Sequence, residues 1–142
     1  QKIQRLADQT GKEISTLEIW EIFEKNFLIP KNGYKYIKHS SSSKDDTNNL
    51  ELEMIFNNSK EIINGSGNGP IDAFINGLKT NLNLDLKVSD YNQSAISSGS
   101  DAKAGAYIEL EMNGKTSWGV GINSSTTKAS FEAIVVGISK LV

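Results

Sequence analysis

Residues 65–70 read Gly-Ser-Gly-Asn-Gly-Pro, and this stretch decides how the chain folds around it. Three glycines in five positions predict a tight turn that another group can approach closely. Pro70 suits the first turn of a helix, where a missing N–H costs nothing. The apolar residues that follow repeat at helical spacing, namely Ile71, Phe74, Ile75 and Leu78. The sequence therefore predicts a strand, a glycine-rich turn and a helix.

A helix that begins in this way has free amides, and these attract a carboxylate or a phosphate. The stretch is neither of the two common phosphate loops. A dinucleotide-binding loop needs its third glycine one residue later, and a Walker loop needs a lysine where Pro70 stands. Asp72 would also repel phosphates. A small carboxylate ligand fits better than a nucleotide, and a turn with no ligand is the other interpretation.

Composition bounds the possible functions. The 142 residues suit one compact domain, and the 37% apolar share is enough for a core. The net charge is −2, acids and bases are intermixed, and Arg5 is the one arginine, so no nucleic-acid partner is expected. No apolar run approaches the roughly 20 residues that span a bilayer, so no membrane partner is expected. The chain has no cysteine, which fits a reducing cytosol, and Gln1 indicates a piece of a longer chain.

Residues suited to catalysis are few. His39 is the one histidine, and there is no cysteine to complete a metal cluster, so a surface or packed role is expected for it. Serines 40–43 lie in a polar segment without a His–Asp relay. Carboxylate pairs two residues apart on predicted strands share one face, which is expected to meet water; these pairs are Glu51/Glu53 and Glu109/Glu111. The sequence predicts no catalytic or metal site.

The first 32 residues read as a helical linker. Residues 1–10 have the pattern of a helix end, and Ser15 with Glu18 forms a capping box for a second helix. That helix is expected to end before Pro30, and Asn32-Gly33 marks a turn.

A first unit of three strands and a helix then spans residues 33–81. Strands are predicted over 34–40, 50–56 and 59–63, with a polar loop over 41–49 and the helix up to about residue 81.

A second unit over residues 84–142 repeats that order. A Ser/Gly cluster at 97–101 and Asn113-Gly114, a strong hairpin signal, separate the predicted strands. The strands are expected over 84–95, 102–112 and 115–122, and a helix over 125–141.

The two units share one further feature. A Gly-x-Gly segment followed by an asparagine is expected between the third strand and the helix in both, at residues 65–68 and 119–123. This indicates an internal duplication. The predicted fold class is α+β: two pseudo-symmetric βββα units packed together, preceded by a short helical linker.

Three ordered blocks carry a family resemblance, at residues 65–74, 90–104 and 118–130. They resemble the C-terminal regulatory domain of 2-isopropylmalate synthases. Residues 1–60 match more loosely, and the segment 14–28 before Pro30 is similar to the linker that precedes this domain.

The resemblance implies a function. The family condenses acetyl-CoA with 2-oxoisovalerate, the committed step of leucine biosynthesis, in a TIM barrel that holds a divalent metal. This chain would be the cytoplasmic feedback domain alone: it would bind leucine as allosteric effector, pair as a homodimer, adjoin the catalytic TIM barrel of the parent chain, and hold no cofactor and no catalytic activity.

The resemblance also implies leucine-site residues. The first block gives Gly67, Gly69, Ile71 and Asp72, and the second gives Val88, Tyr91, Ala95, Ala102 and Ala104. Helix-start amides would accept the leucine carboxylate. Apolar and small side chains would wall its isobutyl group, and Asp72 would balance its ammonium or simply favour the helix start.

Three alternatives stay open. A citramalate synthase carries a related domain that senses isoleucine, and one methyl position is worth only about 1–3 kcal/mol in an apolar pocket. The chain could also be a structural dimerisation module, or a free-standing small-molecule-binding domain.

Overall fold

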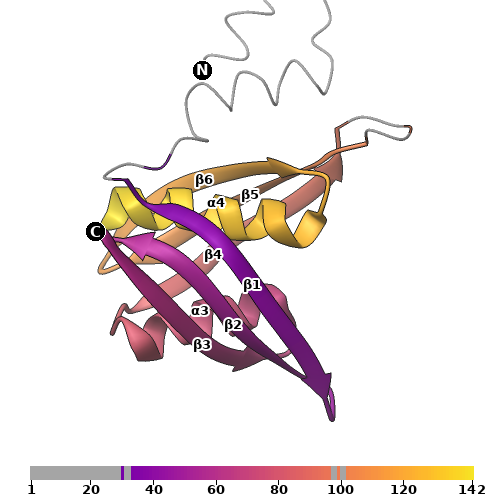
Figure 1. The fold of residues 1–142 in the computed structure, drawn as a ribbon. Coiled ribbons are helices and arrows are strands. Elements are labelled where there is room, and N and C mark those ends of the chain that lie inside the picture. Colours follow the sequence, from indigo (N-terminus) through magenta and orange to yellow (C-terminus); the bar gives the residue numbers. More distant parts are fainter. Residues whose placement is uncertain (1–29, 31–32, 97–98, 100–101) are drawn as a thin grey trace, which may run out of the picture.

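The computed structural model describes residues 30, 33–96, 99 and 102–142. The described part forms two successive βββα units, which confirms the predicted fold class (Figure 1). The first unit contains β1 (Lys35–Lys44), β2 (Thr47–Phe56), β3 (Ser59–Gly67) and α3 (Pro70–Asn81). The second contains β4 (Leu86–Ala95), β5 (Ala104–Met112), β6 (Lys115–Asn123) and α4 (Thr126–Leu141). The predicted linker lies outside the described residues apart from Pro30, and so does most of the predicted turn at 97–101.

Each unit contains a three-stranded antiparallel sheet in sequential order, β1-β2-β3 or β4-β5-β6. Two-residue hairpin turns with positive φ at both positions connect β1 to β2, β2 to β3 and β5 to β6, as type I′ turns require. Asn113 (φ 55°) and Gly114 (φ 80°) form such a turn, as predicted.

The predicted polar loop over 41–49 is wrong. Asp45 (φ 52°) and Asp46 (φ 63°) form another positive-φ turn, and Lys44 pairs directly with Thr47. Aspartate tolerates this left-handed conformation, so two long strands replace the loop. The polar composition reflects exposure of both faces of this hairpin end, which no core covers.

The predicted order of strand, turn and helix is confirmed, but the turn is shorter than expected, because Gly65 and Gly67 lie inside β3 and only residues 68 and 69 separate it from α3. A Cβ at Gly65 would overlap the carbonyl oxygen of Ala73 and lie 2.8 Å from the nitrogen of Gly77. Gly65 is therefore needed for close contact between the strand and α3, and the chain turns only after the strand ends.

The duplication is visible in the strand registers. Each first strand carries a bulge opposite a glutamate of its middle strand: Lys38 pairs with Glu53, and Asp90 with Glu109, directly after a register shift. Bulges are local features that specify where a strand bends. Their equivalent places support the interpretation of the chain as two copies of one unit.

The two units share one core. Helix α3 packs on β3 and β2, and α4 packs on β6 and β5 of its own unit. The helices also contact each other, and each contacts the first strand of the other unit: α4 meets β1 and α3 meets β4 (Figure 1). Phe131 of α4 meets Phe74 of α3 edge-on, with ring centroids 5.4 Å apart. Both rings are fully buried, so α3 and α4 are held at the centre of the domain.

No helix in the described ranges is long and apolar enough to cross a bilayer.

Candidate ligand-binding site

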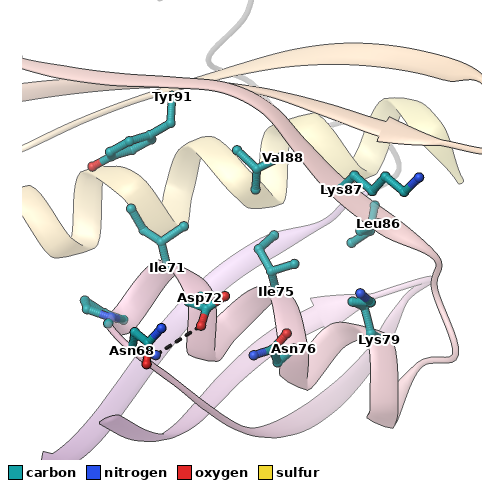
Figure 2. Close-up of a pocket in the computed structure, with 12 residues that line it drawn as sticks. Asn68, Ile71, Asp72, Ile75, Asn76, Lys79, Leu86, Lys87, Val88 and Tyr91 are labelled. Atoms are coloured by element: carbon teal, nitrogen blue, oxygen red, sulfur yellow. Dashed lines mark hydrogen bonds between the residues drawn. The ribbon is translucent and has the colours of Figure 1, made fainter. Parts of the chain in front are cut away.

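A pocket of about 680 Å³ lies where β4 of the second unit passes over α3 of the first (Figure 2). Ile71 and Ile75 point from α3 toward β4, and Val88 and Tyr91 line the opposite wall. Ile75 is almost fully buried, whereas Val88 is 41% exposed. The pocket is thus an open, largely apolar groove, which suits a branched aliphatic group.

The amino-terminal end of α3 lines one end of this groove. Gly69 is the N-cap residue, has extended backbone (φ −160°) and gives the helix no side-chain cap. By contrast, the Ser125 hydroxyl caps α4 by accepting a hydrogen bond from the Lys128 amide at 3.2 Å. The first amides of α3 therefore lack the side-chain acceptor that α4 has, and they favour an anionic group at this end.

Gly69 also leaves this end sterically open. A Cβ built on Gly69 would meet nothing within 4 Å, whereas one on Gly67 would lie 2.7 Å from the amide nitrogen of Ala73. Gly69 lines the pocket, and Gly67 instead lets the start of α3 pack against β3.

Asp72 already has a partner within the loop. Its Oδ2 accepts a hydrogen bond from the backbone N–H of Asn68 at 3.0 Å (Figure 2). This bond fixes the chain just before the helix. Asp72 nevertheless lines the pocket, so its negative charge stands beside the helix start.

The structure brings together five of the nine residues that the resemblance implied: Gly69, Ile71, Asp72, Val88 and Tyr91. The other four lie elsewhere. Gly67 is in β3, Ala95 and Ala104 face each other as cross-strand partners, and Ala102 precedes β5. None of these four lines the pocket. That any of the nine residues contacts leucine stays a prediction.

Sequence reasoning missed several lining residues, among them Ile75, Leu86, Lys79 and Lys87. Ile75 stands one helical turn after Ile71, so the helical period could have found it. No local sequence pattern indicates that residues of β4 lie near Lys79, because β4 belongs to the other unit.

Tyr91 connects the groove to α4. Its hydroxyl donates to the side-chain oxygen of Gln93 at 2.6 Å and lies 2.9 Å from the Ser130 hydroxyl. Ser130 in turn donates to the Thr126 carbonyl at 2.9 Å. A ligand that contacts Tyr91 would therefore touch a residue fixed to the first turn of α4.

His39 holds the place in the first unit that Tyr91 holds in the second: it pairs with Leu52, and Tyr91 pairs with Ile108, one residue after the bulge in each sheet. Its Nδ1 is 2.7 Å from the Tyr36 hydroxyl, and its ring meets Phe131 edge-on. Burial, and then the charge of Lys128, lower the pKa of His39. His39 is thus a packed residue.

Glu132 lies in the same α4–β1 contact region. Its Oε1 accepts a hydrogen bond from the side-chain amide of Asn123 at 3.0 Å. Burial raises the pKa of Glu132, although Asn123 and Lys128 act in the opposite direction. Within the described ranges, no three His, Cys, Asp or Glu residues stand close enough to hold a metal ion.

Two copies of a βββα unit around one core, with a groove between them, define a duplicated α+β domain. The model of the LeuA allosteric (dimerisation) domain matches residues 13–142, and the chain belongs to that family. This agrees with the resemblance found in the sequence.

Relatives named 2-isopropylmalate synthase match almost the whole chain. The protein of Mycobacterium ulcerans is 37% identical over 144 residues, which are 97% of this chain and 25% of that protein. The protein of Thermobifida fusca is 36% identical over 138 residues, which are 97% of this chain and 24% of that protein. The protein of Corynebacterium efficiens is 33% identical over 141 residues, with 97% and 24% covered. The chain thus spans about a quarter of the length of these curated relatives.

Proposed function

We propose that this chain is the leucine-sensing feedback domain of a 2-isopropylmalate synthase. The observation that carries the proposal is the groove beneath β4, which combines an apolar wall with a helix start that has no side-chain cap. The names of the relatives support the enzyme, because the proteins that match almost the whole chain are called 2-isopropylmalate synthase.

The groove matches the chemistry of a leucine zwitterion. The carboxylate would sit at the α3 amides beside Gly69, where the helix dipole favours negative charge. The isobutyl group would lie against Ile71 and Val88, and the ammonium would face Asp72. Each charged group of the ligand would then face a part of the site with the opposite charge.

The rest of the proposal concerns the parent protein. Condensation of acetyl-CoA with 2-oxoisovalerate, with its divalent metal, would take place in a catalytic TIM barrel outside these 142 residues. The parent would be a cytoplasmic homodimer, and the family name supports pairing through this domain. On this proposal the chain itself performs no chemistry.

The test is a thermal-unfolding titration of the chain with leucine, isoleucine and valine. A ligand that binds only the folded state stabilises it by about 2.7 kcal/mol at about 100 times its dissociation constant. Leucine should therefore raise the melting temperature most. Val88→Phe, which fills the groove, should abolish the shift, whereas Ile62→Phe should leave it unchanged. Both sites are similarly exposed, at 41% and 42%, so the fold should tolerate both changes.

The outcomes separate the alternatives. A larger shift with isoleucine would indicate the domain of a citramalate synthase. No shift with any of the three amino acids, in a chain that dimerises, would favour a structural dimerisation module. A leucine shift that survives Val88→Phe would place the ligand outside this groove.

A further inference from the structure

The ligand groove has a counterpart at the equivalent place in the other half of the domain. A second pocket, of about 480 Å³, lies where β1 passes along α4, just as the first lies where β4 passes along α3 (Figure 1). We call it the β1–α4 groove. Its walls come chiefly from the start of β1 and the middle of α4, namely Tyr34, Lys35, Tyr36, Glu132, Val135 and Val136.

The strand walls of the two grooves correspond in register. Tyr36 pairs with Met54 and Val88 pairs with Leu110, each directly before the bulge of its sheet. Tyr36 therefore stands where the ligand groove has Val88, and Tyr34 adds a second ring to the same wall. The β1–α4 groove thus has an aromatic wall in place of an aliphatic one, and the face of an aromatic ring attracts a cation.

The helix walls correspond as well. In each unit a glycine of the third strand lies against an alanine carbonyl oxygen, that of Ala73 in α3 and that of Ala129 in α4. Asn76 and Glu132 follow these alanines at the same spacing, and each lines its own groove. A carboxylate in the β1–α4 groove therefore replaces a neutral amide in the ligand groove.

The helix starts differ in the opposite sense. The first amides of α3 have no side-chain cap, whereas the Ser125 hydroxyl caps α4 by accepting the Lys128 amide. Ser125 thus occupies the place that an anion would take at the start of α3. The β1–α4 groove therefore lacks the feature that favours a carboxylate ligand in the other groove.

Glu132 gives the β1–α4 groove a half-buried negative charge. Its Oε1 accepts a hydrogen bond from the side-chain amide of Asn123 at 3.0 Å. No lysine in the described ranges lies within ion-pair distance of this carboxylate, although Lys128 acts on it from farther away. Burial, and then the charge of Glu132, raise the pKa of Tyr36, so the carboxylate faces that side of the groove. A partly buried carboxylate in such a setting is stabilised by a cation.

We propose that the β1–α4 groove binds a small primary amine, with its ammonium at Glu132 and its apolar chain against Tyr36 and Val135. An amine is favoured over an amino acid, because the α-carboxylate of an amino acid would be held close to Glu132 and repelled by it. Lys35 also lines the groove, but its side chain is exposed and can turn toward water. The two grooves would thus select opposite charged groups on similar apolar chains.

The test uses 3-methylbutylamine, which has the ammonium and the branched chain of leucine but no carboxylate. Calorimetric titration of the chain should show saturable binding. Glu132→Gln should raise the dissociation constant about tenfold or more, because glutamine still accepts the bond from Asn123 but has no charge. Glu51→Gln is the matched control, since it removes an exposed carboxylate on β2, and it should leave the dissociation constant unchanged.

A second pair of variants tests the aromatic wall. Tyr36→Leu removes the ring and should weaken amine binding about fivefold. Tyr36→Phe keeps the ring and loses only the hydroxyl, which lies 2.7 Å from Nδ1 of His39, so it should bind the amine nearly as the unchanged chain does. Circular dichroism would establish that all of these variants fold.

Val88→Phe shows which groove holds the amine, because it fills the other one. Amine binding that survives Val88→Phe and falls in Glu132→Gln supports the inference. Binding that is lost in Val88→Phe and kept in Glu132→Gln would place the amine in the ligand groove and overturn it. A chain that takes up no amine at about 50 mM, or binds it equally in every variant, overturns it too. The leucine titration is read separately, so a chain that binds the amine but not leucine contradicts the proposed function alone.

Discussion

Gly65 and Gly121 hold the same place in the two units, each pressed against the backbone of its own helix. A Cβ at Gly65 would lie 2.8 Å from the nitrogen of Gly77, and one at Gly121 would lie 2.9 Å from the nitrogen of Ala133. In both cases it would also overlap an alanine carbonyl oxygen, of Ala73 or Ala129. Backbone atoms cannot move aside as a flexible side chain can. Glycine at these two positions therefore sets how closely α3 and α4 approach their sheets.

Gly65→Ala and Gly121→Ala should each lower the free energy of unfolding by about 1–3 kcal/mol, the usual cost of overpacking. Gly69→Ala is the control, because it has open space and ordinary extended backbone, and it should change stability by no more than about 0.5 kcal/mol. Urea unfolding gives all three values. Equal stability of Gly65→Ala and Gly69→Ala would mean that the helix can shift at no cost.

Tyr91→Phe should lower the free energy of unfolding by about 1 kcal/mol. It removes the hydroxyl that lies 2.9 Å from Ser130 and so loosens β4 from α4. Gln93→Ala removes the other, exposed partner of that hydroxyl and should cost less. Urea unfolding of both variants measures the difference; a greater loss in Gln93→Ala would show that Ser130 is not the important contact.

Glu132→Gln should stabilise the protein at neutral pH. Burial raises the folded-state pKa of Glu132 above its ordinary value of 4.5, so its protonated carboxyl group favours folding below that pH and this benefit is lost as pH rises through the folded-state pKa. Glutamine stays neutral and can still accept the bond from Asn123. Because Glu132 is only half-buried, the gain at pH 7 should stay below about 1 kcal/mol.

Thermal unfolding from pH 4 to pH 7 measures this effect. The difference between Glu132→Gln and the unchanged chain should grow with pH and vanish below 4.5. Glu51→Gln, at an exposed strand position, is the comparison variant. A difference that is constant across the range would mean that the substitution acts through packing.

Ile71→Ala and Ala104→Leu distinguish the two groups of residues that the resemblance implied as leucine contacts. Ile71 lines the groove, and Ala104 does not. If leucine binds in the groove, Ile71→Ala should weaken it about tenfold or more, the effect of losing about 1.4 kcal/mol, and Ala104→Leu should leave it unchanged. Calorimetric titration measures both. Loss of binding only in Ala104→Leu would move the site toward Ala95 and Ala104.

The sequence determined the elements of the fold. The period of apolar residues predicted α3, and Asn113-Gly114 predicted the hairpin between β5 and β6, because these signals depend on neighbours within one turn or one strand pair. The repeated order of elements predicted two βββα units. Local composition predicted a loop around Asp45-Asp46, but the structure has a hairpin there. The exposed end of a hairpin contains the same polar residues as a loop.

The tertiary structure decided what each residue contacts. Gly65 was predicted as a turn residue because nothing in the sequence around it shows that the backbone of a helix lies close to its Cα. Ile71 and Val88 form one groove because β4 of one unit crosses α3 of the other. Val120 and Asn64 stand at equivalent places, yet only the fold shows that both point outward. Local pattern fixes which face of an element is apolar, but the element that covers that face comes from far along the chain, and only packing brings the two together.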